Sequence, residues 1–256
     1  MLLIESTYAA TLKHQVNPEF ELAKVINETV QRKGVLVIPS FALGRTQSLL
    51  FEIRALKESG EIPDLPVIVD SPMAQDATQI YAQFPNEYDE EALQILKSGR
   101  RPFSFPRLEF TKTSDESKAI NKRKGPLVII SASGMATGGR ILHHLRQRLP
   151  SPENTVLFVG FQPVGSRGDL IKQGREWISI FNERVPVKAH VRSIGGLSAH
   201  ADQTELLRWY QSCSGSPSKI AVVHGEPESA HMFAALLHEK FGVKAFPPSY
   251  KEVWDI

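Results

Sequence analysis

The sequence has very little cysteine and no long apolar run. Cys213 is the single cysteine among 256 residues, which excludes an intramolecular disulfide and a cysteine-rich zinc site. No stretch approaches the roughly 18 consecutive apolar residues of a membrane-spanning helix, and the N-terminus lacks the layout of a signal peptide. We therefore expect a cytoplasmic protein that does not bind membranes.

An excess of charge of one sign is also absent. The formal net charge is +2 at pH 7, which neither requires nor excludes a nucleic acid, because a basic groove can exist within a near-neutral total. Basic residues cluster at positions 97–101, 118–124 and 140–148. Such clusters are usually solvated faces, and contact with nucleic acid is the alternative.

The histidine pairs that commonly bind zinc are missing. The sequence contains no His-x-His, no His-x-x-x-His and no His-x-x-Asp-His. His143 and His144 are adjacent on a predicted helix, so they point about 100° apart and cannot chelate one ion together. We expect both to be structural or solvent-facing. The sequence thus predicts part of a metal site rather than a whole one.

Apolar runs bounded by turn signals alternate with helical patterns along the chain, which is typical of βα units and predicts an α/β fold with a mainly parallel sheet. We expect strands at residues 1–5, 35–38, 66–70, 127–130, 155–159, 188–194, 219–223 and 244–246. An apolar strand at residue 2 needs neighbours on both sides. Either these neighbours come later in the chain, or an N-terminal portion is missing.

Two histidines lie at predicted strand ends, where α/β folds usually build their sites. His200 stands in the segment Ser-Ala-His-Ala-Asp at 198–202, just before a predicted helix, and His224 stands in Val-Val-His-Gly-Glu at 222–226. His200 is either structural or a general acid for phosphodiester cleavage. His224 is either a satisfied polar residue or a metal ligand on a rigid backbone.

Two small-residue loops join strands to helices. In the first, residues 131–140, free amides beside Arg140 could hold a phosphate; the alternative is a plain tight connection, because the loop matches neither common phosphate-binding glycine pattern. In the second, residues 41–45, the arrangement recurs with Arg45. We take Arg45 and Arg140 as candidate substrate-binding residues.

Five segments, taken together, resemble the β-CASP family of metallo-β-lactamase-fold nucleases, which includes the endonuclease of mRNA 3′-end processing and bacterial and archaeal relatives. They are Leu-Ile-Glu-Ser-Thr-Tyr at 3–8, Pro-Ser-Phe-Ala-Leu-Gly-Arg at 39–45, the Ser-Gly-Met loop at 133–135, and the two histidine segments at 198–202 and 223–226. The resemblance covers the whole chain in order. It implies a ribonuclease that uses two zinc ions in its complete form, with RNA as substrate.

The resemblance also implies roles for individual residues. Glu5 would hydrogen-bond His200, orienting and charging it, and His200 would act as general acid or stabilise the leaving group. His224 would be a zinc ligand. Ser198 and the loop at Ser133 and Gly134 would lie near the path of the phosphate.

The family also implies a domain plan. Residues 1–10 would form a strand of the metallo-β-lactamase αββα domain, residues 11–187 the inserted β-CASP domain, a doubly wound sheet that clamps RNA, and residues 188–256 a C-terminal lactamase and RNA-specificity segment. The family motif usually continues with Gly and a polar-basic pair, whereas this chain has Ala-Ala-Thr at 9–11. This departure alters a turn beside the motif.

The main zinc-binding signature of the family, His-x-His-x-Asp-His, precedes the Glu-Ser-Thr motif and is absent here. A catalytic zinc needs about three protein ligands, and His224 supplies one. We therefore expect weak zinc binding or none, and no RNA cleavage by this chain alone.

Two other functions remain open at this stage. The first is a non-catalytic module that binds RNA or a protein partner, and the second, less favoured, is a small-molecule hydrolase. In either case, uncovered strand edges predict self-association.

Overall fold

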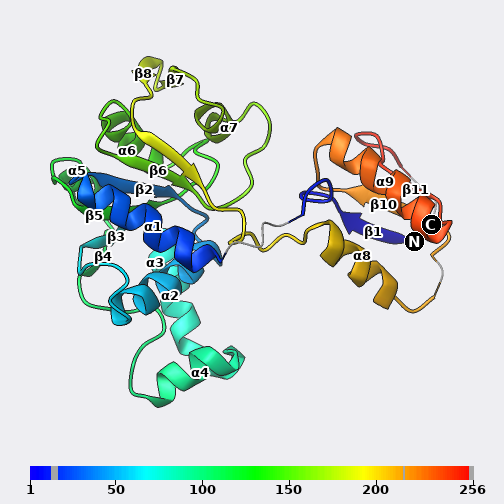
Figure 1. The fold of residues 1–256 in the computed structure, drawn as a ribbon, viewed down its shortest axis with the longest axis horizontal. Helices are drawn as coiled ribbons and strands as arrows, with labels where there is room; N and C mark the ends of the chain where they lie inside the picture. The colour runs from blue at the N-terminus through cyan, green and yellow to red at the C-terminus, as the bar shows by residue number, and fades with distance from the viewer. Residues whose placement is uncertain (13–16, 216, 254–256) are drawn as a thin grey trace. The chain divides into compact units, whose positions relative to one another are not determined.

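The computed structural model describes residues 1–12, 17–215 and 217–253, which form two compact units (Figure 1). The small unit combines Met1–Gln15 with Ser198–Ile256, and the large unit is Val16–Leu197. None of the described helices is both long and apolar enough to cross a membrane.

The large unit is built on a six-stranded sheet in which all neighbouring strands are parallel. In spatial order the strands are β4 (Leu108–Phe110), β3 (Val67–Val69), β5 (Leu127–Ser131), β2 (Val35–Pro39), β6 (Thr155–Phe158) and β9 (His190–Ser193). The central strands β2 and β5 are buried throughout. Their continuous apolar sequences are those of strands covered on both faces.

Helices cover both faces of this sheet (Figure 1). The helical elements of the large unit are α1 (Pro18–Gln31), α2 (Arg45–Glu58), α3 (Pro72–Gln83), the 3₁₀ turn η1 (Pro85–Glu87), α4 (Glu90–Lys97), α5 (Ser114–Ile120), α6 (Ile141–Arg148) and α7 (Arg167–Lys172), of which η1 and α4 contribute no residue to the two cores that flank the sheet. Along β2, Leu36 packs with α1 and α2 in one core, whereas Val35 and Val37 pack with α6 in another. This alternation with a period of two residues confirms the predicted doubly wound α/β fold.

The small unit holds a three-stranded parallel sheet, with β1 (Leu2–Glu5) next to β10 (Ile220–Val223) and β10 next to β11 (Ala245–Phe246). Two helices, α8 (Gln203–Ser212) and α9 (Pro227–Phe241), complete it. Ile4 of β1 packs with Phe233 and Leu237 of α9 in the core. A neighbour of the first strand therefore comes from late in the chain.

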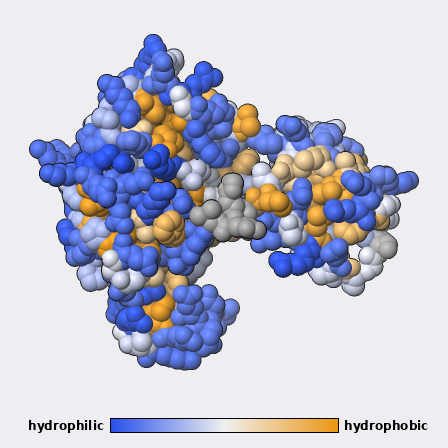
Figure 2. All heavy atoms as spheres, viewed as in Figure 1, coloured by the Kyte–Doolittle hydropathy of each residue, from blue (hydrophilic) through white to orange (hydrophobic). Residues whose placement is uncertain are grey.

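Part of the small unit's apolar surface has no cover in the structure. Within the described residues β1 is an edge strand, and Leu3 on it is 57% exposed. Figure 2 shows apolar residues on the visible face of this unit. Exposed edges of this kind can pair with other chains, and self-association stays a prediction.

The strand predicted at 188–194 lies in a different unit from the one we expected. We placed it in the C-terminal segment, but β9 pairs with β6 in register from Thr155 opposite His190 to Phe158 opposite Ser193. The compact units divide after Leu197, and the domain boundary that we expected after residue 187 stays a prediction. The turn signal at Pro186 marks the end of an antiparallel hairpin, β7 (Trp177–Ile180) with β8 (Glu183–Pro186), and not a boundary between units.

Backbone segments approach closely where β2 begins. A Cβ atom at Gly34 would lie 1.8 Å from the carbonyl oxygen of Glu153, so a side chain at this position requires the backbone to move. We predict that Gly34→Ala lowers the free energy of unfolding of the large unit by about 2 kcal/mol, measured by urea denaturation. Gly160→Ala is the matched control, because a Cβ there meets nothing within 4 Å. Equal denaturation midpoints for the two variants would contradict the prediction.

Candidate functional site

Three titratable side chains meet in the small unit. Glu5 ends β1, His224 follows β10, and His200 lies just before α8. Because β1 and β10 are parallel and Glu5 is opposite Val223, the carboxyl ends of both strands lie side by side. One potential ligand atom from each of the three residues lies within 4.8 Å of the others. The rings of His200 and His224 stack with centroids 5.1 Å apart.

Glu5 orients His200. Oε1 of Glu5 lies 3.2 Å from Nδ1 of His200 and accepts a hydrogen bond from the backbone amide of Ala201. Oε2 of Glu5 accepts a hydrogen bond from the backbone amide of Thr7. Burial alone would raise the pKa of Glu5, but the hydrogen bonds from Thr7 and the attraction of His200 outweigh it, so the pKa lies below its ordinary value. The carboxylate is thus ionised at neutral pH with its oxygens occupied by donors. Nε2 of His200 is the ring nitrogen left for another group.

Thr7 holds His224 in a definite orientation. The hydroxyl of Thr7 donates to the backbone oxygen of His224 at 2.8 Å and lies 3.1 Å from its Nδ1. Since the hydroxyl donates its single hydrogen to the backbone oxygen, its oxygen accepts a hydrogen bond from the N–H group at Nδ1. An imidazole protonated at Nδ1 has its lone pair at Nε2, which is the form that binds a metal.

The backbone at His224 is strained and tightly packed. Its φ is 54°, which is uncommon for a residue other than glycine and recurs at functional sites. A Cβ at Gly225 would lie 2.3 Å from Oγ of Ser6. Glycine at position 225 therefore allows the turn after β10 to press against the segment that carries Glu5 and Thr7.

Ser198 lies in the same turn as His200. Its Oγ accepts a hydrogen bond from the amide of His200 at 3.3 Å. The helix that follows begins with a capping box formed by Asp202 and Glu205, a pattern typical of a helix start. Ser198 therefore shapes the turn, and its contact with a phosphate stays a prediction.

The remaining candidates lie in the large unit, at the carboxyl ends of the adjacent strands β2 and β5. Ser133 accepts hydrogen bonds from the amides of Thr137 and Gly138, so the loop folds around its hydroxyl. A Cβ at Gly134 would lie 3.1 Å from the ring of Phe41. The structure thus brings the two small-residue loops together, with Arg45 at the start of α2.

The guanidinium of Arg140 has a structural role that the sequence did not reveal. It donates to Oδ1 of Asp70 at 2.8 Å and to the backbone oxygens of Thr111 and Lys112. Its charge is therefore paired with a carboxylate, and its contact with a phosphate stays a prediction. Phosphate binding by Arg140 would have to compete with this pair.

Asp70 is the centre of a buried polar network. It ends β3, is inaccessible to solvent, and accepts hydrogen bonds from Thr111, Ser117, Arg140 and His144. Burial alone would raise its pKa, but these four donors, led by His144, hold it well below its ordinary value. Of the two possibilities for His144, structural or solvent-facing, the structural one is correct. An aspartate directly after a buried strand was the only signal for this network.

Two family models match the chain. One, the Beta-Casp domain, matches residues 46–171, and the other, the RNA specificity domain of Zn-dependent metallo-hydrolases, matches residues 184–248. The chain belongs to the β-CASP family. The first match lies within the large unit, and the second includes both His200 and His224.

Curated β-CASP relatives agree with this assignment. A ribonuclease of Thermus thermophilus is 37% identical over 85% of this chain and 49% of its own length. A transcription termination factor, FttA, of Pyrococcus horikoshii is 32% identical over 97% of this chain and 39% of its own length. An RNase J-like protein of Methanocaldococcus jannaschii is 31% identical over 97% of this chain and 57% of its own length. The chain thus spans about half the length of these relatives, or less.

The Asp70 network predicts a pH-dependent loss of stability. Because the pKa of Asp70 is lower in the folded protein than its unfolded value of about 3.9, its contribution is present above about pH 4 and is lost as the pH falls further. We predict that Asp70→Asn lowers the free energy of unfolding at pH 7 by about 3 kcal/mol, measured by urea denaturation. The difference from the parent chain should shrink below about pH 4. Asp76→Asn, at an exposed position, is the control, and an equally small effect of both changes would contradict the prediction.

Proposed function

We propose that residues 1–256 are part of a zinc-dependent ribonuclease that hydrolyses RNA phosphodiester bonds. The cluster of Glu5, His200 and His224 carries this proposal: each imidazole has Nδ1 bonded to a neighbour and Nε2 left for another group. The names of the ribonuclease and RNase J-like relatives support RNA as the substrate.

His224 would hold zinc through Nε2, because Thr7 fixes the ring in the required tautomer. Zinc accepts neutral imidazole nitrogens as ligands, and in a complete site it supplies an activated water. Glu5 fits a ligand role poorly, since its oxygens already accept three hydrogen bonds. Further ligands would have to come from outside these 256 residues, in which the His-x-His-x-Asp-His signature is absent.

His200 would donate the proton. With Nδ1 bonded to Glu5, the proton on Nε2 can pass to the oxygen that leaves the phosphorus when the phosphodiester bond breaks. The negative charge of Glu5 stabilises the protonated ring and holds it in position, as the buried aspartate does in a catalytic triad. Glu5 is thus a positioning residue and His200 the catalytic one.

The phosphate backbone of RNA would contact the loops that follow β2 and β5, through Ser133, the amide of Gly134, and Arg45. On the small unit, Ser198 would contribute beside His200. A cytoplasmic location is part of this proposal, and it stays a prediction from the sequence.

Substitutions of His200 and His224 should have different effects on zinc binding. In a protein that joins this chain to an upstream segment with the His-x-His-x-Asp-His signature, His200→Ala should lower single-turnover cleavage of single-stranded RNA at least about 100-fold, while most of the zinc remains. His224→Ala should lose zinc as well as activity. Zinc content is measured by atomic spectroscopy on the same samples. His231→Ala, an exposed histidine of the same unit that is bonded to the oxygen of Pro227, is the control, and equal zinc loss in the first two variants would overturn the assignment.

The isolated chain should be catalytically incomplete. Because it supplies one expected zinc ligand where about three are needed, we predict substoichiometric zinc after dialysis and no cleavage of single-stranded RNA. Stoichiometric zinc together with robust cleavage would contradict this prediction. RNA binding without cleavage, even in the joined protein, would instead favour a non-catalytic module.

A further inference from the structure

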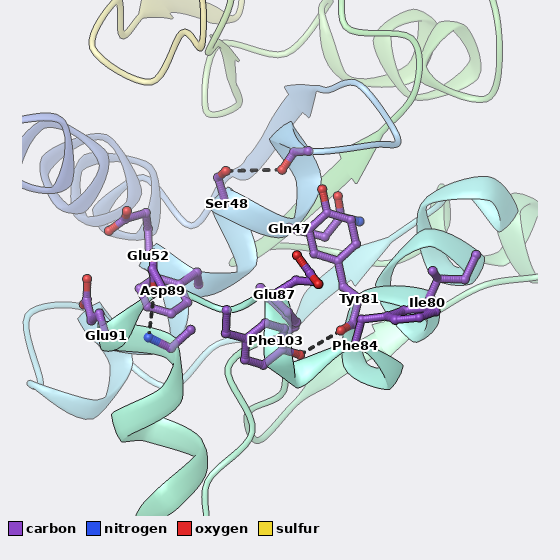
Figure 3. Close-up of a pocket in the computed structure, with 14 residues that line it drawn as sticks. Gln47, Ser48, Glu52, Ile80, Tyr81, Phe84, Glu87, Asp89, Glu91 and Phe103 are labelled. Atoms are coloured by element: carbon purple, nitrogen blue, oxygen red, sulfur yellow. Dashed lines mark hydrogen bonds between the residues drawn. The ribbon is translucent and has the colours of Figure 1, made fainter.

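A pocket of about 640 Å³ lies in the large unit, lined by residues of α2, α3, η1 and α4 and by Phe103 (Figure 3). None of its lining residues is among the site residues discussed above. Carboxylates and aromatic rings make up much of its wall. Carboxylates and the faces of aromatic rings both attract cations.

The aromatic part of the wall is fixed in position. The ring of Phe103 meets the rings of Tyr81 and Tyr88 edge-on, with centroids 5.8 and 5.9 Å apart. The hydroxyl of Tyr88 donates to the backbone oxygen of Tyr81 at 2.9 Å. The faces of such rings attract cations, and their carbon atoms pack against aliphatic chains.

The acidic part of the wall comes from α2, from α4 and from the segment that joins η1 to α4. Glu52 projects from α2 beside Glu91 of α4, as Figure 3 shows, and Glu87 and Asp89 also line the pocket. Burial, then the charge of Glu19 and a hydrogen bond with it, and then the charge of Glu91 raise the pKa of Glu52 to about 7. These carboxylates therefore create a negative potential at Glu52 that a bound cation would relieve.

A buried acceptor lies at the same pocket. Gln47 is 1% exposed and lines the pocket, and its Nε2 donates to Oγ1 of Thr78 at 2.9 Å. Its Oε1 has no hydrogen-bond partner among the described residues. Nε2 of Gln47 also donates to the backbone oxygens of Ala42 and Ala74, so this side chain fixes the wall of the pocket where α2 and α3 meet.

We propose that this pocket binds a flexible organic cation, namely an aliphatic chain that carries ammonium or guanidinium groups. The aliphatic part would pack on the rings of Tyr81, Tyr88 and Phe103, and the charged groups would pair with Glu52 and Glu91. The carboxylates would repel an anion such as an RNA phosphate. The ligand could be a free polyamine or a lysine or arginine side chain of a partner, which share this chemistry.

The test titrates the full 256-residue chain with spermidine and, separately, with N-acetyl-argininamide, using calorimetry at physiological salt. We expect saturable binding of at least one probe. The double variant Glu52→Gln with Glu91→Gln should raise the dissociation constant about tenfold or more. The matched control is Glu90→Gln, which changes the neighbouring exposed carboxylate on the same helix, outside the pocket, and it should leave the constant within about twofold.

A second variant separates this pocket from a simple patch of negative charge. Phe103→Leu keeps an apolar side chain but removes the ring face, so it should weaken binding several-fold while the carboxylates stay in place. Binding of spermidine alone would support a free amine as the ligand, and binding of argininamide alone would support a side chain. The proposal is overturned if neither probe saturates, if Glu90→Gln weakens binding as much as the double variant, or if Phe103→Leu binds as the parent does.

Discussion

The parallel pairing of β1 with β10 is the constraint on which the candidate site depends. It sets Glu5 opposite Val223, although the two residues are far apart in the sequence. The hydrogen bonds of Ser6 to Val223, at the end of β10, and of Thr7 to His224 follow from the same register. A shift of one residue would turn every side chain of β1 to the opposite face. Glu5 would then leave His200, and Ile4 would leave the core.

The structure contains carboxylates in two opposite situations. Asp70 and Glu5 lose solvent but gain several hydrogen-bond donors, and the pKa of each is lowered. Glu52 loses solvent beside other carboxylates, and its pKa is raised. The first two are satisfied within their own unit. The third shares a hydrogen bond with Glu19 and is partly protonated near neutral pH.

Most strands of the fold could be predicted from the sequence, because buried parallel strands have continuous apolar sequences. The strands β2, β5, β6 and β10 were predicted on this basis. Short elements with mixed sequences were harder: β4 and the hairpin of β7 and β8 carry partly exposed residues. The pairing of β9 with β6 could not be predicted, because the sequence of a strand does not show which edge of a sheet it joins.

The site shows the same limit. The resemblance to family motifs paired Glu5 with His200 correctly, since motif order carries information about contacts. Nothing local distinguished His144, which is buried against Asp70, from its neighbour His143. The partner of Arg140 likewise depends on β3 lying next to β5. Contacts of this kind arise from sheet order, which a single sequence does not contain.

The small unit is discontinuous in the chain, because residues 16–197 separate its first strand from the rest. Joining β1 to β10 therefore closes a very long loop, and the entropic cost of closure grows with the logarithm of the loop length. Once the large unit has folded, the distance between its first and last residues is set by its structure, so the loop is no longer flexible. The small unit should then assemble late, after its insertion has folded. A substitution that unfolds the large unit should therefore also disrupt the cluster of Glu5, His200 and His224, although none of these residues lies in the large unit.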